Sequence, residues 1–388
     1  MKVFLSIVAL AGLGLAADMN VWDLDDSYQT PERKGAFDKA YSDAEVLAVK
    51  AKEDLEKLKS ARPDFVSNMR TNWDRIARAA TNMFGFVPNK DGHDPNEEHY
   101  SNVRYVYDRM VKTLHNDEMI PANGYGGLKP LLLCDESKFV WVGRDDKDPH
   151  DPAGRLLRES RPKEMGDSKA GAWVYKKRYL VNGVKQANTG LCRPGVFAVT
   201  LTRNDFIIFC PPSFQDPVAG TRSAVDAKDS VQKDDMLDTY SATSLSRVMV
   251  HELAHWFGGD GNGGTENRNI PDQQAVGKEG ALVWQKPDGK RTTDASLKDL
   301  KRYLTFANHR VTTDNFMWVS NLARSHEGAN AGNSGPSKAT FTAESYALFA
   351  LMSYMDNWDW ANDGKAKAFV DEMIPYERLP NSKKVRLG

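Results

Sequence analysis

Apolar residues change their spacing along this chain, from a helical period to a strand-like one and back. Three stretches carry apolar residues at helical spacing and predict helices over residues 33–60, 64–84 and 95–115. From about residue 128, short β-rich runs bounded by turn residues replace this period. Later helices are expected over residues 298–311, 314–324 and 342–358. This order predicts an α+β protein with a small sheet between two helical regions of the sequence.

Short apolar runs make up the expected sheet region. They cover residues 131–133, 139–142, 173–181, 196–201 and 206–209. The last two runs flank the turn residues 203–205 and therefore predict a β-hairpin. A loop rich in Pro, Ser, Asp and Lys follows over residues 211–237 and leads to the next helix.

A helix with two histidines is predicted over residues 238–257, which contain no Pro or Gly. Its apolar stripe consists of Leu245, Met249, Leu253 and Trp256. His251 and His255 lie four residues apart and away from the centre of that stripe, so both can project from one face. We expect this helix to bury one side and to present both histidines from another.

The two histidines and the adjacent Glu252 form the pattern HExxH. In zinc hydrolases this pattern directs two imidazoles to one metal ion, with the glutamate beside the open coordination position. Zinc lowers the pKa of a bound water to about 7 and polarises a carbonyl. Glu252 would accept the proton from the attacking water and return it to the leaving amine. The alternative is a chance match, in which the histidines of an amphipathic helix are merely hydrogen-bonded.

A third protein ligand is needed, and the residues leave several candidates open. A histidine ten residues after the first is absent because Gly261 stands there, and Asp260 is one residue short of that position. A glutamate on a later helix would be Glu279 or Glu344. An aspartate beyond the Gly-rich turn would be Asp272. A short carboxylate suits a chain that leaves the helix at glycines and returns to its histidine face.

The segments around the HExxH helix resemble the fungal deuterolysin-like metallopeptidases, the aspzincins. In that family a Gly-Thr step, an Asp ligand and Tyr-Gly follow the helix. This chain has Gly264-Thr265 and then Asp272 within residues 269–277, and segments 210–214 and 343–350 are also similar. The resemblance covers about residues 190–355. It implies a zincin-like fold, one Zn²⁺ ion held by His251, His255 and Asp272, and endopeptidase activity on protein or peptide substrates.

Two departures from the family pattern bear on activity. Gly277 lies one position later than in the family, and Val276 stands where the family has a tyrosine that is thought to help hold the oxyanion. Tyr346 is a candidate substitute, although a tyrosine in an apolar helix commonly belongs to the core. These departures keep a second hypothesis open, a catalytically inactive secreted binding protein or effector with the zincin fold.

Cysteine usage and the start of the chain indicate export. Residues 1–17 have the charged start, apolar run and small-residue exit of a secretory signal peptide, so we expect a secreted protein. Cys192 and Cys210 flank the predicted hairpin, and a disulfide between them would staple it. Cys134 would then be free, although it could also be the true partner of either other cysteine.

The length of 388 residues exceeds the usual size of one core. We expect a signal peptide over residues 1–17, a helical N-terminal subdomain over 18–125, a catalytic domain over 126–375 and a basic tail over 376–388. The chain has 52 basic and 53 acidic residues, a formal net charge of −1. That balance gives no reason to expect a nucleic acid or a membrane as partner, and a monomer is expected.

Overall fold

The computed structural model describes residues 19–65, 67–92, 97–117, 128–241, 244–258, 270–278, 280–286, 288–293, 310–325 and 335–374. The expected signal peptide, the basic tail and most of the expected helix over 298–311 lie outside the described residues. So do the ligand candidates Asp260 and Glu279 and the Gly264-Thr265 step.

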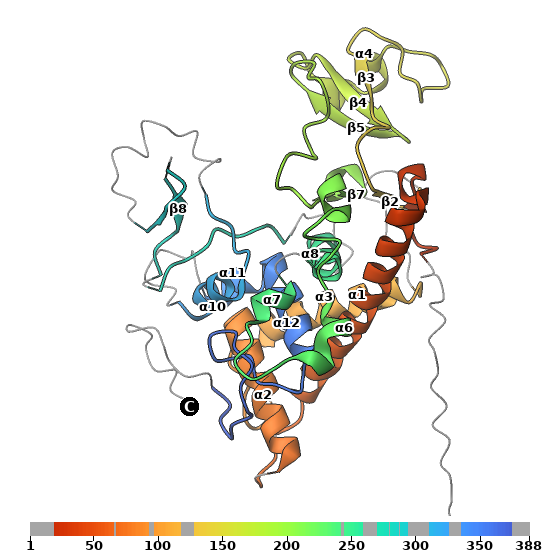
Figure 1. Cartoon of the computed structure of the whole chain (residues 1–388). Coiled ribbons are helices and arrows are strands. Elements are labelled where there is room, and N and C mark those ends of the chain that lie inside the picture. Colours follow the sequence, from red (N-terminus) through yellow and green to blue (C-terminus); the bar gives the residue numbers. More distant parts are fainter. Residues whose placement is uncertain are drawn as a thin grey trace, which may run out of the picture.

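Three long helices open the described chain and confirm the first three predicted helices (Figure 1). They are α1 (Pro31–Lys57), α2 (Asn68–Phe84) and α3 (Glu97–Leu114). Proline at the first position starts α1, where its missing N–H costs no hydrogen bond. Gly85 ends α2 in the left-handed region at φ 80°, and its N–H caps the carbonyl of Thr81.

A four-stranded sheet follows in the order β1-β2-β7-β6. Its strands are β1 (Asp23–Leu24), β2 (Leu131–Leu133), β6 (Ala198–Leu201) and β7 (Phe206–Phe209). β2 pairs in parallel with β1 and β7, whereas β6 pairs antiparallel with β7 through the predicted hairpin. The strand β6 therefore forms one edge of this sheet.

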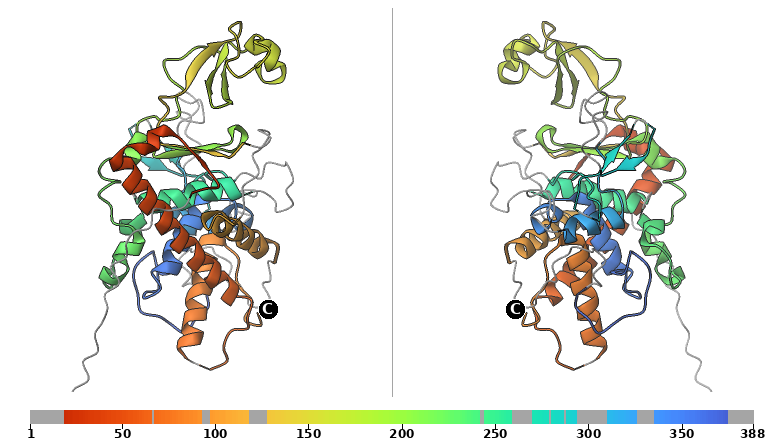
Figure 2. Two further views of the ribbon diagram at one scale, coloured as in Figure 1. Left: turned by 90° about the vertical axis from the view of Figure 1, so that its right-hand side faces the viewer. Right: turned by 90° about the vertical axis from the view of Figure 1, so that its left-hand side faces the viewer.

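Alternating side chains of the four-stranded sheet serve two different cores. Leu132, Ile207 and Phe209 face the helices. Leu133 and Phe206 face the other way, toward a lobe built on a second, three-stranded sheet. That lobe contains β3 (Val140–Gly143), β4 (Gly171–Tyr175) and β5 (Arg178–Asn182), with the short helices α4 (Leu157–Ser160) and α5 (Pro162–Met165). Figure 2 shows the resulting layers of lobe, sheet and helices.

The single run predicted over residues 173–181 is two strands in the structure. β4 and β5 form an antiparallel hairpin in which Tyr175 pairs with Arg178. The turn between them is made by Lys176 and Lys177, both in the left-handed region at φ 41° and 64°. Lysines are not typical turn residues, so the sequence carried no signal for this reversal.

The remaining elements complete the helical side and the loops. They are η1 (Asp26–Gln29), η2 (Thr202–Asn204), η3 (Pro211–Phe214), α6 (Ala224–Ala227), η4 (Lys228–Ser230), α7 (Leu237–Ser241), α8 (Leu245–Phe257), β8 (Trp284–Gln285), β9 (Arg291–Thr292), α10 (Phe316–Arg324), α11 (Pro336–Ala339) and α12 (Ala343–Tyr354). α10 and α12 confirm the helices predicted over 314–324 and 342–358. No helix among the described residues combines the length and apolarity that a membrane span requires.

The histidine-bearing helix α8 lies at the centre of the helical side. It packs against α1, α3 and α12, and β6 covers it from the sheet. One continuous hydrophobic core includes Phe37 of α1, Tyr107 of α3, Leu253 of α8 and Phe349 of α12. The expected domain boundary near residue 125 stays a prediction, and helices from both sides of it share this core.

A buried ion pair ties three helices together. The Nη2 atom of Arg75 on α2 lies 2.7 Å from Oδ2 of Asp54 on α1, and the two side chains are 2% and 0% exposed. The guanidinium also donates to the carbonyl of Met352 on α12 at 3.3 Å. The pair thus fixes the mutual placement of α1, α2 and α12.

We expect Asp54→Asn to lower the free energy of unfolding by about 3–5 kcal/mol, because it leaves the guanidinium of Arg75 buried without a carboxylate. The matched control is Asp226→Asn, which breaks a 3.0 Å pair with Lys39 whose side chains are 42% and 51% exposed. That change should cost about 1 kcal/mol or less. Urea denaturation measures both values, and equal losses for the two variants would contradict the structural role of the buried pair.

Candidate metal centre

The helix α8 starts later than the sequence predicted. The stretch 238–257 contains the short helix α7 and then α8, which begins at Leu245 after Ser244 and ends at Phe257 before Gly258. The predicted apolar stripe is confirmed, since Leu245, Met249, Leu253 and Trp256 are all buried. His251 and His255 are partly exposed on another side of the helix, as expected.

After α8 the chain returns to the histidines at Ile270. A side chain at position 258 would clash there, because a Cβ atom would lie 2.8 Å from the backbone nitrogen of Ile270. Glycine at this position therefore permits the close approach. The buried Ile270 is followed by Pro271 and Asp272, so the tight return delivers the Asp272 carboxylate to the histidine face.

Three donor atoms converge at this point. Oδ1 of Asp272 lies 3.1 Å from Nε2 of His251 and 3.5 Å from Nε2 of His255. The two Nε2 atoms are 3.0 Å apart. Donors bound at ~2.0–2.2 Å to one tetrahedral ion are ~3.3–3.6 Å from each other. The triangle of two imidazole nitrogens and one carboxylate oxygen has the shape of one face of such a coordination sphere, and two of its three sides are about 0.2–0.3 Å shorter than the lower end of this range. Together with Glu252, the two histidines form a group that could hold a metal ion.

Each imidazole is held through its other nitrogen. Nδ1 of His255 contacts the carbonyl oxygen of Ile270, and Nδ1 of His251 lies 2.9 Å from Oε2 of Glu344. In the tautomer in which Nδ1–H donates to these oxygens, Nε2 carries a free lone pair toward Asp272. Hydrogen bonds of this kind orient histidine ligands in metal centres.

Glu344, one of the alternative third ligands, has this orienting position instead. Its carboxylate is fully buried and accepts hydrogen bonds from Nε of Arg247 at 3.0 Å and from Nη2 of the same residue. Burial raises the pKa of a carboxyl group, but here Arg247 and His251 outweigh it and hold the pKa of Glu344 below its usual value. The carboxylate therefore stays charged behind His251.

The surrounding charges favour a cation at the histidines. Burial lowers the pKa of His251, but the carboxylates of Asp272 and Glu344 outweigh it and raise this pKa to about 10. Burial likewise raises the pKa of Asp272, and the two histidines outweigh that effect and hold it well below its usual range. The centre thus favours a positive charge between the two carboxylates, which a proton or a metal cation can supply.

Glu252 lies on the sheet side of the same centre. Its side chain is buried, and its Oε2 atom accepts a 2.6 Å hydrogen bond from Oγ1 of Thr200. The same hydroxyl lies 3.2 Å from the backbone carbonyl of Glu252. Thr200 belongs to the edge strand β6, so the strand and the histidine helix are joined directly at the candidate catalytic carboxylate.

Tyr346, the candidate oxyanion residue, lies in the hydrophobic core. It is 0% exposed, and its ring contacts Phe84 and Tyr107. Its hydroxyl donates to the carbonyl of Thr340 at 2.8 Å, and burial raises its pKa. This placement favours the core role over the oxyanion role, because the hydroxyl is already committed to a backbone carbonyl.

The expected disulfide is present. Cys192 and Cys210 are bonded, with Cα atoms 5.3 Å apart, so the bridge joins the segment before β6 to the end of β7. This arrangement is consistent with an extracellular protein. Cys134 is a buried free thiol, and burial raises its pKa to about 12. Cys134 therefore forms no disulfide with Cys192 or Cys210.

Sequence reasoning missed Thr200, Ile270 and Arg247. Only Arg247 had a local signal, because Arg247, His251 and His255 recur every four residues on one helical face. The other two reach the site through the fold. Comparisons with protein-family models, with curated proteins and with solved structures found no match to the chain. The functional argument therefore rests on the geometry of the candidate metal centre.

Proposed function

We propose that the chain is a secreted zinc-dependent endopeptidase. The observation that carries this proposal is the triangle of His251, His255 and Asp272 donor atoms, with Glu252 adjacent and hydrogen-bonded to an edge strand. A set of two imidazoles and one carboxylate is typical of catalytic zinc sites, which have three protein ligands. The side chain of Asp272 is 47% exposed, so the centre is open to a substrate from solvent.

In the proposed hydrolysis, the metal ion and the side chains of the protein would have different roles. Zinc bound by the three donors would supply Lewis acidity to a water molecule and to a substrate carbonyl. Glu252 would accept the proton of the attacking water and return it to the leaving amine. Because Thr200 donates to Oε2 of Glu252, it orients the carboxylate and leaves Oε1 for this transfer. Glu344 and Ile270 would keep both imidazoles in the ligand orientation.

The edge strand supports a peptide as the substrate. Among the described strands, β6 pairs only with β7, so its other edge can pair with an extended peptide through backbone hydrogen bonds. Because Thr200 contacts Glu252, a peptide bound along β6 would lie beside the candidate base. This mode of binding recognises main chain in the middle of a polypeptide and therefore favours endopeptidase activity.

We expect the purified protein to cleave denatured casein, and 1,10-phenanthroline to abolish the cleavage. Metal analysis should give one zinc per chain, and adding Zn²⁺ back to the chelated protein should restore activity. The ion is needed because, in this mechanism, it supplies the Lewis acidity that polarises the carbonyl and activates the water. Cleavage that persists in the chelator would contradict a metallopeptidase, and a chain that binds no metal would support the chance-match hypothesis.

A second candidate function is a zincin-like binding protein or effector without turnover. It is favoured by the placement of Tyr346 in the core and by the buried Val276 at the position of the family's tyrosine, which leave the oxyanion role unassigned. One bound zinc per chain without chelator-sensitive cleavage would support this second function.

A further inference from the structure

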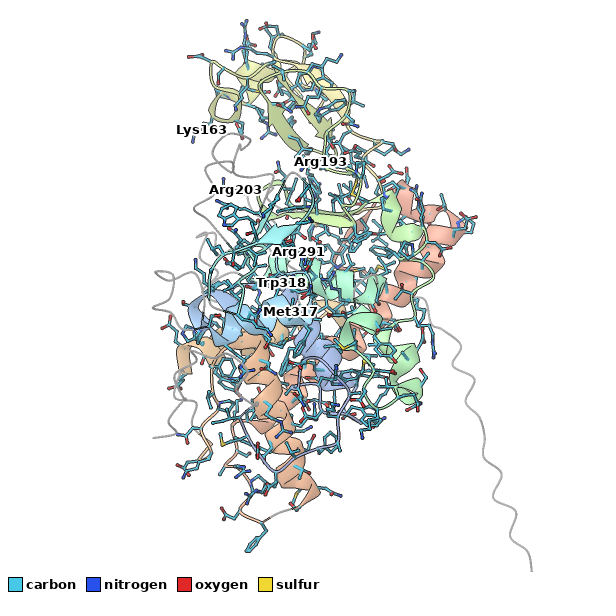
Figure 3. The ribbon with its side chains drawn as sticks, turned by 60° about the vertical axis from the view of Figure 1, so that its left-hand side comes forward. Lys163, Arg193, Arg203, Arg291, Met317 and Trp318 are labelled. Atoms are coloured by element: carbon cyan, nitrogen blue, oxygen red, sulfur yellow. A yellow bond between two sulfur atoms is a disulfide. The ribbon has the colours of Figure 1, made fainter. Side chains whose placement is uncertain are left out.

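Exposed cations from four separate segments gather on the face beside the metal centre. Figure 3 shows them in a column that runs from the upper lobe down to α10. They are Lys163 of α5, Arg193 before β6, Arg203 of η2 and Arg291 of β9, and all four are exposed. We call these four residues the cationic face.

Most of this charge is not neutralised by neighbouring carboxylates. Within the described part of the chain, Lys163, Arg193 and Arg203 form no ion pair. Arg291 has one weak partner, since its Nη2 atom lies 3.7 Å from Oδ2 of Asp314 and both side chains are about half exposed, at 47% and 50%. The whole chain has a net charge of only −1, so this group of cations without strong ion pairs is a local feature.

The cationic face adjoins the candidate catalytic groups on two sides. Arg203 follows Thr200 by three residues, no more than about 10 Å of extended chain, and Thr200 contacts Glu252. On the other side, Asp314 interacts with Arg291 and also with Glu344 and Arg247 behind the metal ligands. Along the chain, Arg193 precedes β6 and Arg203 follows it, so the two cations lie at the two ends of the edge strand (Figure 3). Arg291 is linked to the centre through Asp314.

Apolar groups accompany the lower end of the column. The guanidinium of Arg291 lies 5.5 Å from the centroid of the Trp318 ring. Met317 is 45% exposed, and Figure 3 shows it with Trp318 directly below Arg291. This part of the face can contact the carbon chain of a ligand while the arginine pairs with its charge.

We propose that the cationic face selects polypeptide substrates with acidic residues on both sides of the cleaved bond. This inference rests on the proposed peptidase function and adds the substrate class. Cations at both ends of β6 would pair with carboxylates that flank a segment bound along that strand. A polypeptide is favoured over a nucleic acid because the edge strand lies between the cations and offers main-chain hydrogen bonds to an extended peptide.

The test measures binding separately from hydrolysis. Full-length Glu252→Gln is titrated against fluorescein-labelled peptides that share one neutral centre and carry glutamates or lysines on both flanks. Fluorescence anisotropy should show the acidic peptide binding about tenfold or more tightly, and raising NaCl from about 50 to about 500 mM should remove most of the difference. With the wild-type protein, kcat/KM should favour the acidic peptide in the same sense.

Single substitutions locate the effect. Arg203→Gln and Arg291→Gln should each weaken binding of the acidic peptide roughly two- to fivefold, with no weakening for the lysine peptide. The matched control is Lys90→Gln, which removes an exposed cation in the loop after α2 and should change neither affinity. Because these side chains are exposed, folding should be unaffected, and circular dichroism checks it.

Three outcomes would overturn the inference. They are equal affinity for the two peptides, a loss in Lys90→Gln that matches the arginine variants, and tighter binding of a single-stranded oligonucleotide than of the acidic peptide. Chelator-sensitive casein cleavage with equal affinities would leave the peptidase standing and remove the acidic preference. Tight binding of the acidic peptide without any cleavage would support the binding role of the cationic face and contradict the peptidase function.

Discussion

Glu252→Gln will retain the metal and lower kcat/KM on peptide substrates by roughly 10²–10⁴-fold. Glutamine keeps the size of the side chain and can still accept the hydrogen bond from Thr200, but it cannot take a proton from water. The proposed ligands His251, His255 and Asp272 are untouched by this change. Stopped assays with a fluorogenic peptide measure kcat/KM, and metal analysis of the same sample measures zinc per chain.

A matched control separates the proton transfer from its positioning. Thr200→Val removes the 2.6 Å hydrogen bond to Oε2 while keeping the shape of the side chain and the carboxylate itself. Its loss in kcat/KM should be much smaller than that of Glu252→Gln, because the carboxylate remains able to accept a proton. Undiminished proteolysis by Glu252→Gln would remove the proposed mechanism.

Asp272→Ala should lower zinc affinity by more than about 100-fold, whereas Glu344→Gln should lower it by about 10–100-fold. Asp272 has an oxygen 3.1 Å and 3.5 Å from the two Nε2 atoms, so its removal would take away one of the three proposed ligands. Glu344 only orients His251 from behind, and a glutamine oxygen can still accept from Nδ1. Competition with a chromophoric chelator measures both affinities.

Comparing the loss of zinc affinity in these two variants shows which residue is the third ligand. Unchanged zinc affinity in Asp272→Ala would exclude it as a ligand and would reopen the assignment to residues such as Asp260 or Glu279. A larger loss in Glu344→Gln than in Asp272→Ala would contradict the orienting role of Glu344. Thermal unfolding of the metal-free variants shows whether either change acts through the fold, which matters most for the buried Glu344.

Local patterns were sufficient for much of the fold and for the centre of the site. Helical spacing of apolar residues predicted α1, α2 and α3. α1 and α3 each bury one side against the core, whereas α2 is buried on all sides from Trp73 to Phe84. The hairpin of β6 and β7 and its disulfide followed from two strand runs flanked by Cys192 and Cys210. HExxH predicted the convergence of His251 and His255 because a helix determines the relative placement of residues four apart.

The supporting residues of the site could not be predicted, because they reach it through contacts between segments that are distant in sequence. Glu344 is 93 residues from His251 in sequence, and Thr200 is 52 residues from Glu252. No periodicity within one element reports such pairs. A carboxylate on an apolar helix could equally be a ligand or an orienting group, and only the packing of α12 on α8 distinguishes the two. The same packing decides that Tyr346 belongs to the core.

The central position of α8 bears on how such an activity could be controlled. Because α1 and α3 pack directly on α8, the first third of the described chain forms part of the wall behind the histidines. Proteolytic removal of these helices would expose the apolar back of α8 and would not uncover the side that carries the histidines. Release of this region would leave the exposed side of Asp272 unchanged, so we expect the three N-terminal helices to remain part of the folded protein.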